Sequence, residues 1–252
     1  GRTREHVQRA LALEPSLAEP HAALAYALLL ERKLTDAETE IQRAFALKPN
    51  YAVAHLWRGV MKFYEGRIDT TLEEFEKATA LDPLKPINVY MWSDALALAG
   101  RVDEALEMSE RAAALRPDLW TPILGEQAQL WWLKGKTDAA VAAARKVRQL
   151  WPQPPRWFAD AYAIWVLRQA GHSAEATDYA NQLLKELPAT NSHRGFVLAA
   201  LGRLGDALPY LERCAVMSNR SLFWAPMWDE FRADPRFGQL LAQLGCAAEY
   251  QV

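Results

Sequence analysis

Six prolines recur along the chain at an almost constant spacing, and this spacing constrains the fold more than any other feature. The prolines are Pro15, Pro49, Pro83, Pro117, Pro152 and Pro188. The first three intervals between them are each 34 residues, and the last two are 35 and 36. A fixed period of this length is typical of helix-turn-helix repeats that stack into a solenoid. The sequence therefore predicts an all-α fold, a solenoid of antiparallel helix pairs.

Glycines and carboxylates divide each repeat into two helices. Four glycines lie 17 residues before a proline: Gly66, Gly100, Gly135 and Gly171. Glycine supplies the left-handed backbone that ends a helix, and proline stops the next helix because it has no N–H to donate. Acidic residues that favour a helix start follow the glycine turns: Asp69, Asp103, Asp138 and Asp206. Thr35 and Glu38 are predicted to form a capping box. No stretch alternates with a period of two, so no strand is expected.

The repeats set the expected domain boundaries. Residues 1–16 correspond only to the second helix of a repeat, so we expect the chain to begin in mid-repeat. We expect either that it is a piece of a longer protein or that something covers the exposed face of this helix. Residues 220–252 are expected to form a helical cap. In this cap Asp234 precedes a helix that begins at Pro235, and Trp228 or Phe231 packs back on it. Six repeats lie between these ends, over residues 17–50, 51–84, 85–118, 119–153, 154–189 and 190–219.

The offsets of small residues in the repeats resemble those of the tetratricopeptide repeat (TPR) family. Members of that family have a small residue in the middle of the first helix, an alanine near the start of the second and a proline at its end. The corresponding first-helix residues here are Ala25, Gly59, Ser93, Ala128 and Gly195, and repeat five departs from the pattern with Ile164. The resemblance implies a right-handed superhelix whose first helices line a concave groove. Because Ile164 is large, we expect looser packing or a changed superhelical angle in repeat five.

The end of the chain shows a second resemblance. The stretch from Trp228 to Phe237, followed by a short leucine-containing helix, is similar to the closing element of TPR regions in bacterial signalling proteins. In those proteins the N-terminal output domain is an adenylate or guanylate cyclase, a winged-helix regulator or a serine/threonine kinase. The resemblance implies a C-terminal regulatory module and leaves the nature of the output domain open.

Composition and charge argue against several other functions. The chain has no apolar run near the roughly 18 residues that a membrane span requires, and its net charge of −2 gives no electrostatic footprint for nucleic acid. Cys214 and Cys246 lack metal-ligand spacing, so we expect both to be packed free thiols. The sequence thus favours a cytoplasmic protein that uses no cofactor or metal, and it leaves the oligomeric state open.

No set of residues predicts catalysis. The histidines include no pair at metal-ligand spacing, and His21 and His55 lie one period apart, which favours a structural role for both. No strand precedes a glycine-rich stretch that could hold a phosphate. We therefore do not expect this chain to be an enzyme.

The concave groove that the TPR resemblance implies is aromatic. It is expected to contain Tyr26, Leu56, Phe63, Tyr64, Tyr90, Trp132, Tyr162, Trp165, Arg168 and Phe196. Only Arg168 among them offers the charge-assisted hydrogen bonds of a carboxylate clamp. The favoured partner is instead an apolar or amphipathic protein segment, from another chain or from this protein itself. The alternatives are a small apolar ligand in the same groove, self-assembly through the N-terminal edge, and packing of many of these rings inside the core.

Overall fold

The computed structural model describes residues 7, 9–10, 14, 16–31, 33–116, 121–150, 158–213 and 225–243, and these contain helices and no strand. The all-α prediction is therefore confirmed. Some predicted features lie outside the described residues: Pro15, Pro117, Pro152, Cys214, Asn219 and Cys246. The chain divides into two compact units, residues 1–95 and residues 96–252. The division falls inside helix α6 (Pro86–Leu98), and thus inside the third predicted repeat.

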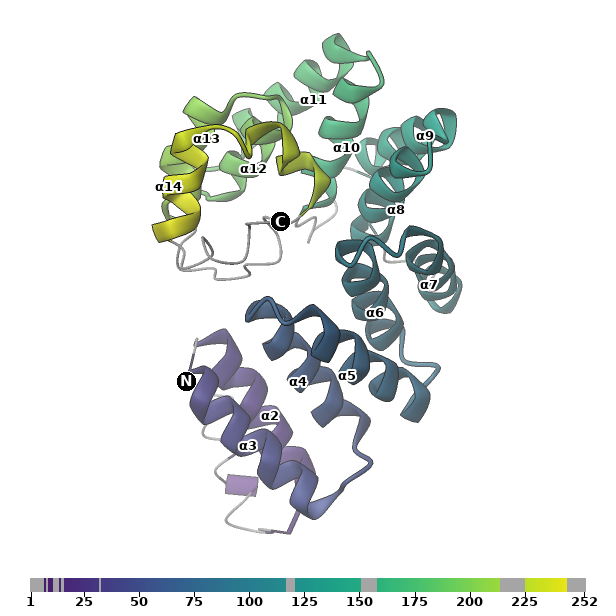
Figure 1. Cartoon of the computed structure of the whole chain (residues 1–252), viewed down its shortest axis with the longest axis vertical. Helices are drawn as coiled ribbons and strands as arrows, with labels where there is room; N and C mark the ends of the chain where they lie inside the picture. Colours follow the sequence, from purple (N-terminus) through teal and green to yellow (C-terminus); the bar gives the residue numbers. More distant parts are fainter. Residues whose placement is uncertain are drawn as a thin grey trace. The chain divides into compact units, whose positions relative to one another are not determined.

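The first unit contains two antiparallel helix pairs and the start of α6 (Figure 1). The first pair is α2 (Ala18–Leu30) with α3 (Leu34–Leu47), and the second is α4 (Ala52–Tyr64) with α5 (Ile68–Leu81). Small residues allow the paired helices to approach closely. A Cβ atom placed on Gly59 would lie 2.5 Å from the ring of Phe75, so only glycine fits this part of α4 without a shift of that ring.

The second unit begins with the end of α6 and continues through a longer series of helices: α7 (Val102–Leu115), α8 (Thr121–Leu133), α9 (Thr137–Gln149), α10 (Ala159–Gln169), α11 (Ser173–Glu186), α12 (His193–Ala200) and α13 (Leu204–Leu211). A 3-10 helix η3 (Pro226–Phe231) and a final helix α14 (Pro235–Gln243) follow. One continuous hydrophobic core joins α8 to α14. Helices α8 and α10 approach so closely that a Cβ on Gly125 would lie 2.4 Å from the Cα of Ala159.

The turns between the helices follow the sequence prediction in part. The four predicted glycines, together with Gly202, adopt left-handed φ angles of 69° to 85°. At Gly66 the turn closes with a hydrogen bond from the Arg67 N–H to the Lys62 carbonyl oxygen at 2.9 Å. Asp234 also accepts a bond from the N–H of Arg236 at the start of α14. The predicted capping box is wrong, because α3 begins at Leu34 and Thr35 already lies inside the helix.

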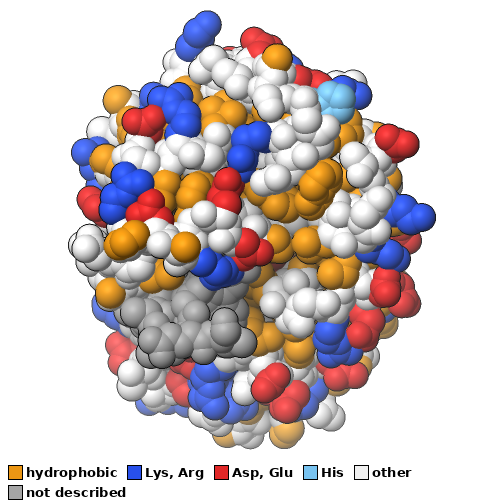
Figure 2. All heavy atoms as spheres, turned by 45° about the horizontal axis from the view of Figure 1, so that its top comes forward, with side chains coloured by type: hydrophobic (Ala, Val, Ile, Leu, Met, Phe, Trp, Pro, Cys, Tyr) orange, Lys and Arg blue, Asp and Glu red, His pale blue; other side chains and the backbone are white. Residues whose placement is uncertain are grey.

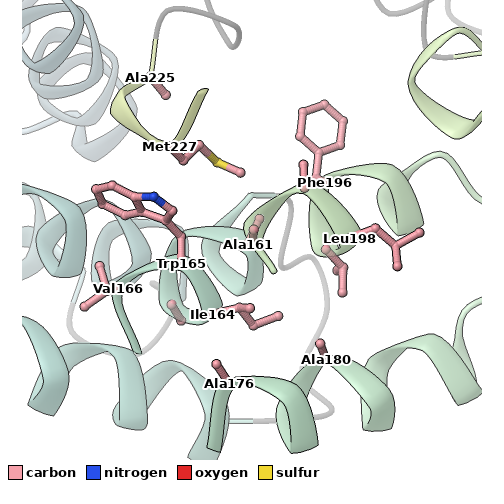
Figure 3. Close-up of a cluster of buried hydrophobic side chains, with 14 of the residues drawn as sticks. Ala161, Ile164, Trp165, Val166, Ala176, Ala180, Phe196, Leu198, Ala225 and Met227 are labelled. Atoms are coloured by element: carbon pink, nitrogen blue, oxygen red, sulfur yellow. The ribbon is translucent and has the colours of Figure 1, made fainter. Parts of the chain in front are cut away.

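Ile164 is accommodated inside repeat five. Its side chain is completely buried and points toward Ala176 and Ala180 of α11 (Figure 3). The two alanines leave room for the larger side chain. Burial of this one side chain does not test the packing of the whole repeat, so looser packing or a changed superhelical angle in repeat five stays a prediction.

Candidate binding surfaces

One position of the repeat carries an aromatic residue in both units. Tyr26, Trp165 and Phe196 each lie 23 residues before the end of their repeat, at Pro49, Pro188 and Asn219 respectively. Tyr26 is 40% exposed, whereas Trp165 and Phe196 are each only 4% exposed. This position is therefore open in repeat one, whereas it is buried in repeat two, where Val60 is 6% exposed, and in repeats five and six.

The C-terminal segment covers this position in the second unit. Ala225 and Met227 lie on the same side of α10 and α12 as Trp165 and Phe196, and all four are buried in one cluster (Figure 3). The ring of Trp228 meets the ring of Phe196 edge-on, with 5.7 Å between their centroids. Because these rings belong to the core, Trp165 and Phe196 are not free to line a groove, and their predicted partner-binding role is corrected.

Arg168 helps to hold the C-terminal segment against α10 and α12. Its Nε donates to the carbonyl oxygen of Ala200 at 2.8 Å, and its Nη2 forms an ion pair with Glu230 of η3. The one predicted groove residue that could hold a carboxylate thus already holds one from its own chain. Its ion pair fixes the charged end of η3 beside α12.

Aromatic rings pack η3 against α14 in the C-terminal cap. Trp228 is fully buried and stacks on Phe237 of α14, with 5.5 Å between centroids and 11° between planes. The Phe231 ring packs against both, with 6.1 Å between its centroid and that of Trp228 and 6.3 Å to that of Phe237. The prediction that Trp228 or Phe231 packs back on the helix after Pro235 is confirmed for both residues.

In the first unit, the predicted groove residues separate into two groups. Leu56 and Phe63 of α4 are buried, and Phe63 contacts Phe75 with 6.4 Å between ring centroids. These two predictions are corrected, because both side chains are buried and the ring of Phe63 packs against α5. Tyr64 on α4 and Tyr90 on α6 are half-buried. In the second unit, Trp132 and Tyr162 are also half-buried. The rings of Trp132 and Trp165 meet edge-on, with 6.3 Å between their centroids.

The open surface of the first unit centres on an aromatic stack, which we call the Tyr26 surface. It consists of Tyr26 and Leu30 on α2 and Trp57 on α4. Tyr26 and Trp57 stack with 4.3 Å between ring centroids and 23° between planes, and Leu30, one turn beyond Tyr26, is 63% exposed. The sequence prediction missed Trp57 because it selected Leu56, the adjacent residue on the buried face of α4.

The predicted structural histidines bind glutamates within their repeats. His21 Nδ1 lies 2.6 Å from Glu40 Oε2, and His55 Nδ1 lies 2.7 Å from Glu74 Oε2. Burial acts to raise the pKa of Glu74, but the hydrogen bond from His55 and the charges of His55, Arg58 and Lys77 outweigh it and hold the pKa below its usual value. In repeat five a buried Tyr179 donates to Asp160 across the same helix pair. These contacts join the two helices of a repeat, as expected for a structural role.

The described residues show neither a metal-ligand group nor a membrane-spanning helix. Basic and acidic side chains are interspersed on the face shown in Figure 2. In the part of the chain that the structure describes, no three His, Cys, Asp or Glu side chains are grouped as a metal site requires. None of the described helices combines the length and apolarity needed to cross a membrane.

No protein-family model matches the chain, and no curated protein matches it either. Solved structures do. The chain is similar to Pseudomonas aeruginosa PilF, with a TM-score of 0.59 and 17% identity over 86% of this chain and 97% of that one. It is similar to a tetratricopeptide repeat protein from Parabacteroides merdae, with a TM-score of 0.65 and 13% identity over 96% and 91% of the two chains. It is also similar to YrrB, a TPR protein with an unusual peptide-binding site, with a TM-score of 0.54 and 18% identity over 86% and 96%. The helix pairs, the glycine turns and these similarities together show that the chain has the fold of the tetratricopeptide repeat proteins.

Proposed function

We propose that this chain is a non-catalytic protein-interaction scaffold that binds an apolar or amphipathic segment of a partner protein on the Tyr26 surface. The observation that carries the proposal is the contrast between repeats. At the equivalent position of repeats five and six, the chain covers Trp165 and Phe196 with its own apolar segment, whereas Tyr26 is left open. The Tyr26 surface is aromatic like the covered positions, so we expect an apolar segment of a partner protein to cover it.

The chemistry of the Tyr26 surface supports a protein partner. Stacked aromatic rings offer a large rigid contact area at low entropic cost, and aromatic residues are frequent hot spots of protein interfaces. The exposed Leu30 extends this area along α2. An open surface favours an extended or helical segment over a small apolar ligand, which would bury most of its area in an enclosed pocket.

The setting that we propose is the C-terminal regulatory region of a cytoplasmic bacterial signalling or transcription-regulatory protein. The resemblance of the segment from Trp228 to Phe237 to the closing element of such regions supports this setting. In this proposal an N-terminal output domain responds to occupancy of the Tyr26 surface. A partner segment changes that output only if it binds one conformation of the repeats more tightly than another.

Affinity capture from a lysate of the source cell tests the scaffold proposal. The bait is the wild-type chain beside Tyr26→Ala, and the matched control is Leu84→Ala, which truncates an apolar side chain that is 75% exposed in the turn before α6. We expect a partner that is retained by the wild type and by the control and is lost from Tyr26→Ala. Equal retention by all three baits would contradict the proposed site.

A further inference from the structure

A concave site lies in the second unit, on a different face from the covered aromatic residues. It is a cavity of about 680 Å³ between α11, α12 and α13. Arg194 and Leu198 line it from α12, where they lie one turn apart and share a face. Phe196 lies between them in sequence and points to another side of the helix than Leu198 (Figure 3). The cavity is therefore separate from the surface that η3 covers.

The cavity carries an excess of positive charge. Among the described residues that line it, Arg194, Arg203 and Arg213 are basic and Asp206 alone is acidic, which leaves a formal excess of two positive charges. Arg203 is paired with Asp206, whose Oδ2 lies 2.7 Å from Nε and 2.6 Å from Nη2. Arg213 is exposed and has no ion pair with any other described residue. This local excess contrasts with the net charge of −2 of the whole chain.

Arg194 is held in a fixed orientation. Its Nη1 donates to the carbonyl oxygens of Leu184 and Leu187, at 2.6 and 2.8 Å, at the end of α11. Its guanidinium also lies 5.6 Å from the centre of the Tyr210 ring. Its Nε is buried and has no hydrogen-bond partner among the residues that the structure describes. The cavity thus contains a preorganised cation whose hydrogen-bonding capacity is only partly used.

The rest of the cavity wall is largely apolar. Leu184, Leu198, Pro209 and the ring of Tyr210 line it beside the arginines. A ligand that satisfies both parts of this site carries an anionic group and an apolar group. Its anionic group needs about two negative charges to balance the excess.

We propose that this cavity binds the dianion of a phosphate monoester whose ester group is apolar. A phosphate monoester carries about 1.5 to 2 negative charges at neutral pH and offers three acceptor oxygens, which suit planar arginine donors. The phosphate belongs either to a free small molecule or to a phosphorylated side chain of a protein. This site is independent of the function that we propose for the Tyr26 surface.

Titration calorimetry with phenyl phosphate tests the site, with benzoate as a ligand of similar shape and lower charge. We expect phenyl phosphate to bind more tightly at pH 7.5 than at pH 5, because its second proton leaves near pH 6. Benzoate is already ionised over this range, and we expect it to bind at least tenfold more weakly at pH 7.5. No saturable binding of phenyl phosphate, or equal binding of benzoate, overturns the proposal.

Arg213→Gln tests the residues without disturbing the fold, because the Arg213 side chain is exposed and holds no other described residue. The matched control is Arg67→Gln, which removes the same charge from an exposed residue in the first unit. We expect the affinity for phenyl phosphate to fall about tenfold in Arg213→Gln and to stay unchanged in Arg67→Gln. Unchanged affinity in both variants refutes the assignment, provided that both melt like the wild type.

A phosphotyrosine peptide distinguishes the two sources of the phosphate. Binding of the peptide at least tenfold more tightly than phenyl phosphate assigns the site to a phosphorylated protein. Affinities within a factor of ten assign it to a free ester. Either result supports the cavity as a phosphate site only if Arg213→Gln weakens binding of that ligand.

Discussion

Replacing Trp228 with alanine tests whether the C-terminal segment is an integral part of the second unit. The Trp228 ring is fully buried and contacts Phe196, Phe231 and Phe237 with centroid distances of 5.7, 6.1 and 5.5 Å. Truncation of a buried tryptophan removes its transfer free energy and leaves a cavity, which together cost about 3–5 kcal/mol. We expect Trp228→Ala to lower the free energy of unfolding of the second unit by that amount. Denaturant unfolding of the wild type and the variant gives this difference directly.

Amide hydrogen exchange tests whether residues 225–231 cover α10 and α12. If residues 225–231 hold α10 and α12 in place, loss of Trp228 increases amide hydrogen exchange in those two helices. Trp228→Phe keeps an aromatic ring in the cluster, so we expect a smaller loss of stability than with alanine. A loss below about 1 kcal/mol in Trp228→Ala, together with unchanged exchange in α10 and α12, would refute the proposed cover.

Three further predictions concern the contact between α8 and α10, the His55–Glu74 contact and the Tyr26 surface. Gly125→Ala places a Cβ 2.4 Å from the backbone of Ala159, and we expect the overpacking to lower the free energy of unfolding by about 1–3 kcal/mol; Gly238→Ala in α14, where nothing lies within 4 Å, is the control, and an equal effect in both would contradict the close approach of α8 and α10. The lowered pKa of Glu74 stabilises the fold above its unfolded-state pKa, and this contribution is lost as the pH falls through the lower folded-state pKa. The stability gap between wild type and Glu74→Gln should therefore shrink on acidification from pH 6 to pH 3 in denaturant titrations, and a constant gap would contradict the His55–Glu74 contact. Tyr26→Ala should change the free energy of unfolding by less than about 1 kcal/mol, because the ring is largely at the surface; a loss of several kcal/mol would place Tyr26 in the core.

The helices and their turns could be predicted from the sequence because they depend on local chemistry. A left-handed backbone is favourable for glycine, so Gly66 and its equivalents identify the turns without any tertiary information. The capping box at Thr35 was predicted wrongly because local chemistry leaves the first residue of a helix less certain than the turn before it. Several threonines and acidic residues lie near the start of α3, and local spacing does not select the residue at which the helix begins.

The binding surface was harder to predict because burial depends on residues far away in the sequence. Leu56 and Trp57 are neighbours on α4, and a shift of one position moves a side chain by about 100° around the helix, from the core to the surface. Trp165 and Phe196 are buried by Ala225, Met227 and Trp228, which belong to no repeat and carry no periodic signal. The period therefore predicted which positions are equivalent, while the cover over two of them became visible only in the structure.

Site-specific photo-crosslinking at position 30 tests the proposed scaffold role most directly. Leu30 is 63% exposed beside Tyr26, so a photoreactive residue there lies within reach of any segment bound on the Tyr26 surface. The account predicts a crosslinked protein partner from position 30 that disappears with Tyr26→Ala and does not form from position 84. No crosslink from position 30, or the same crosslinks from both positions, would contradict it.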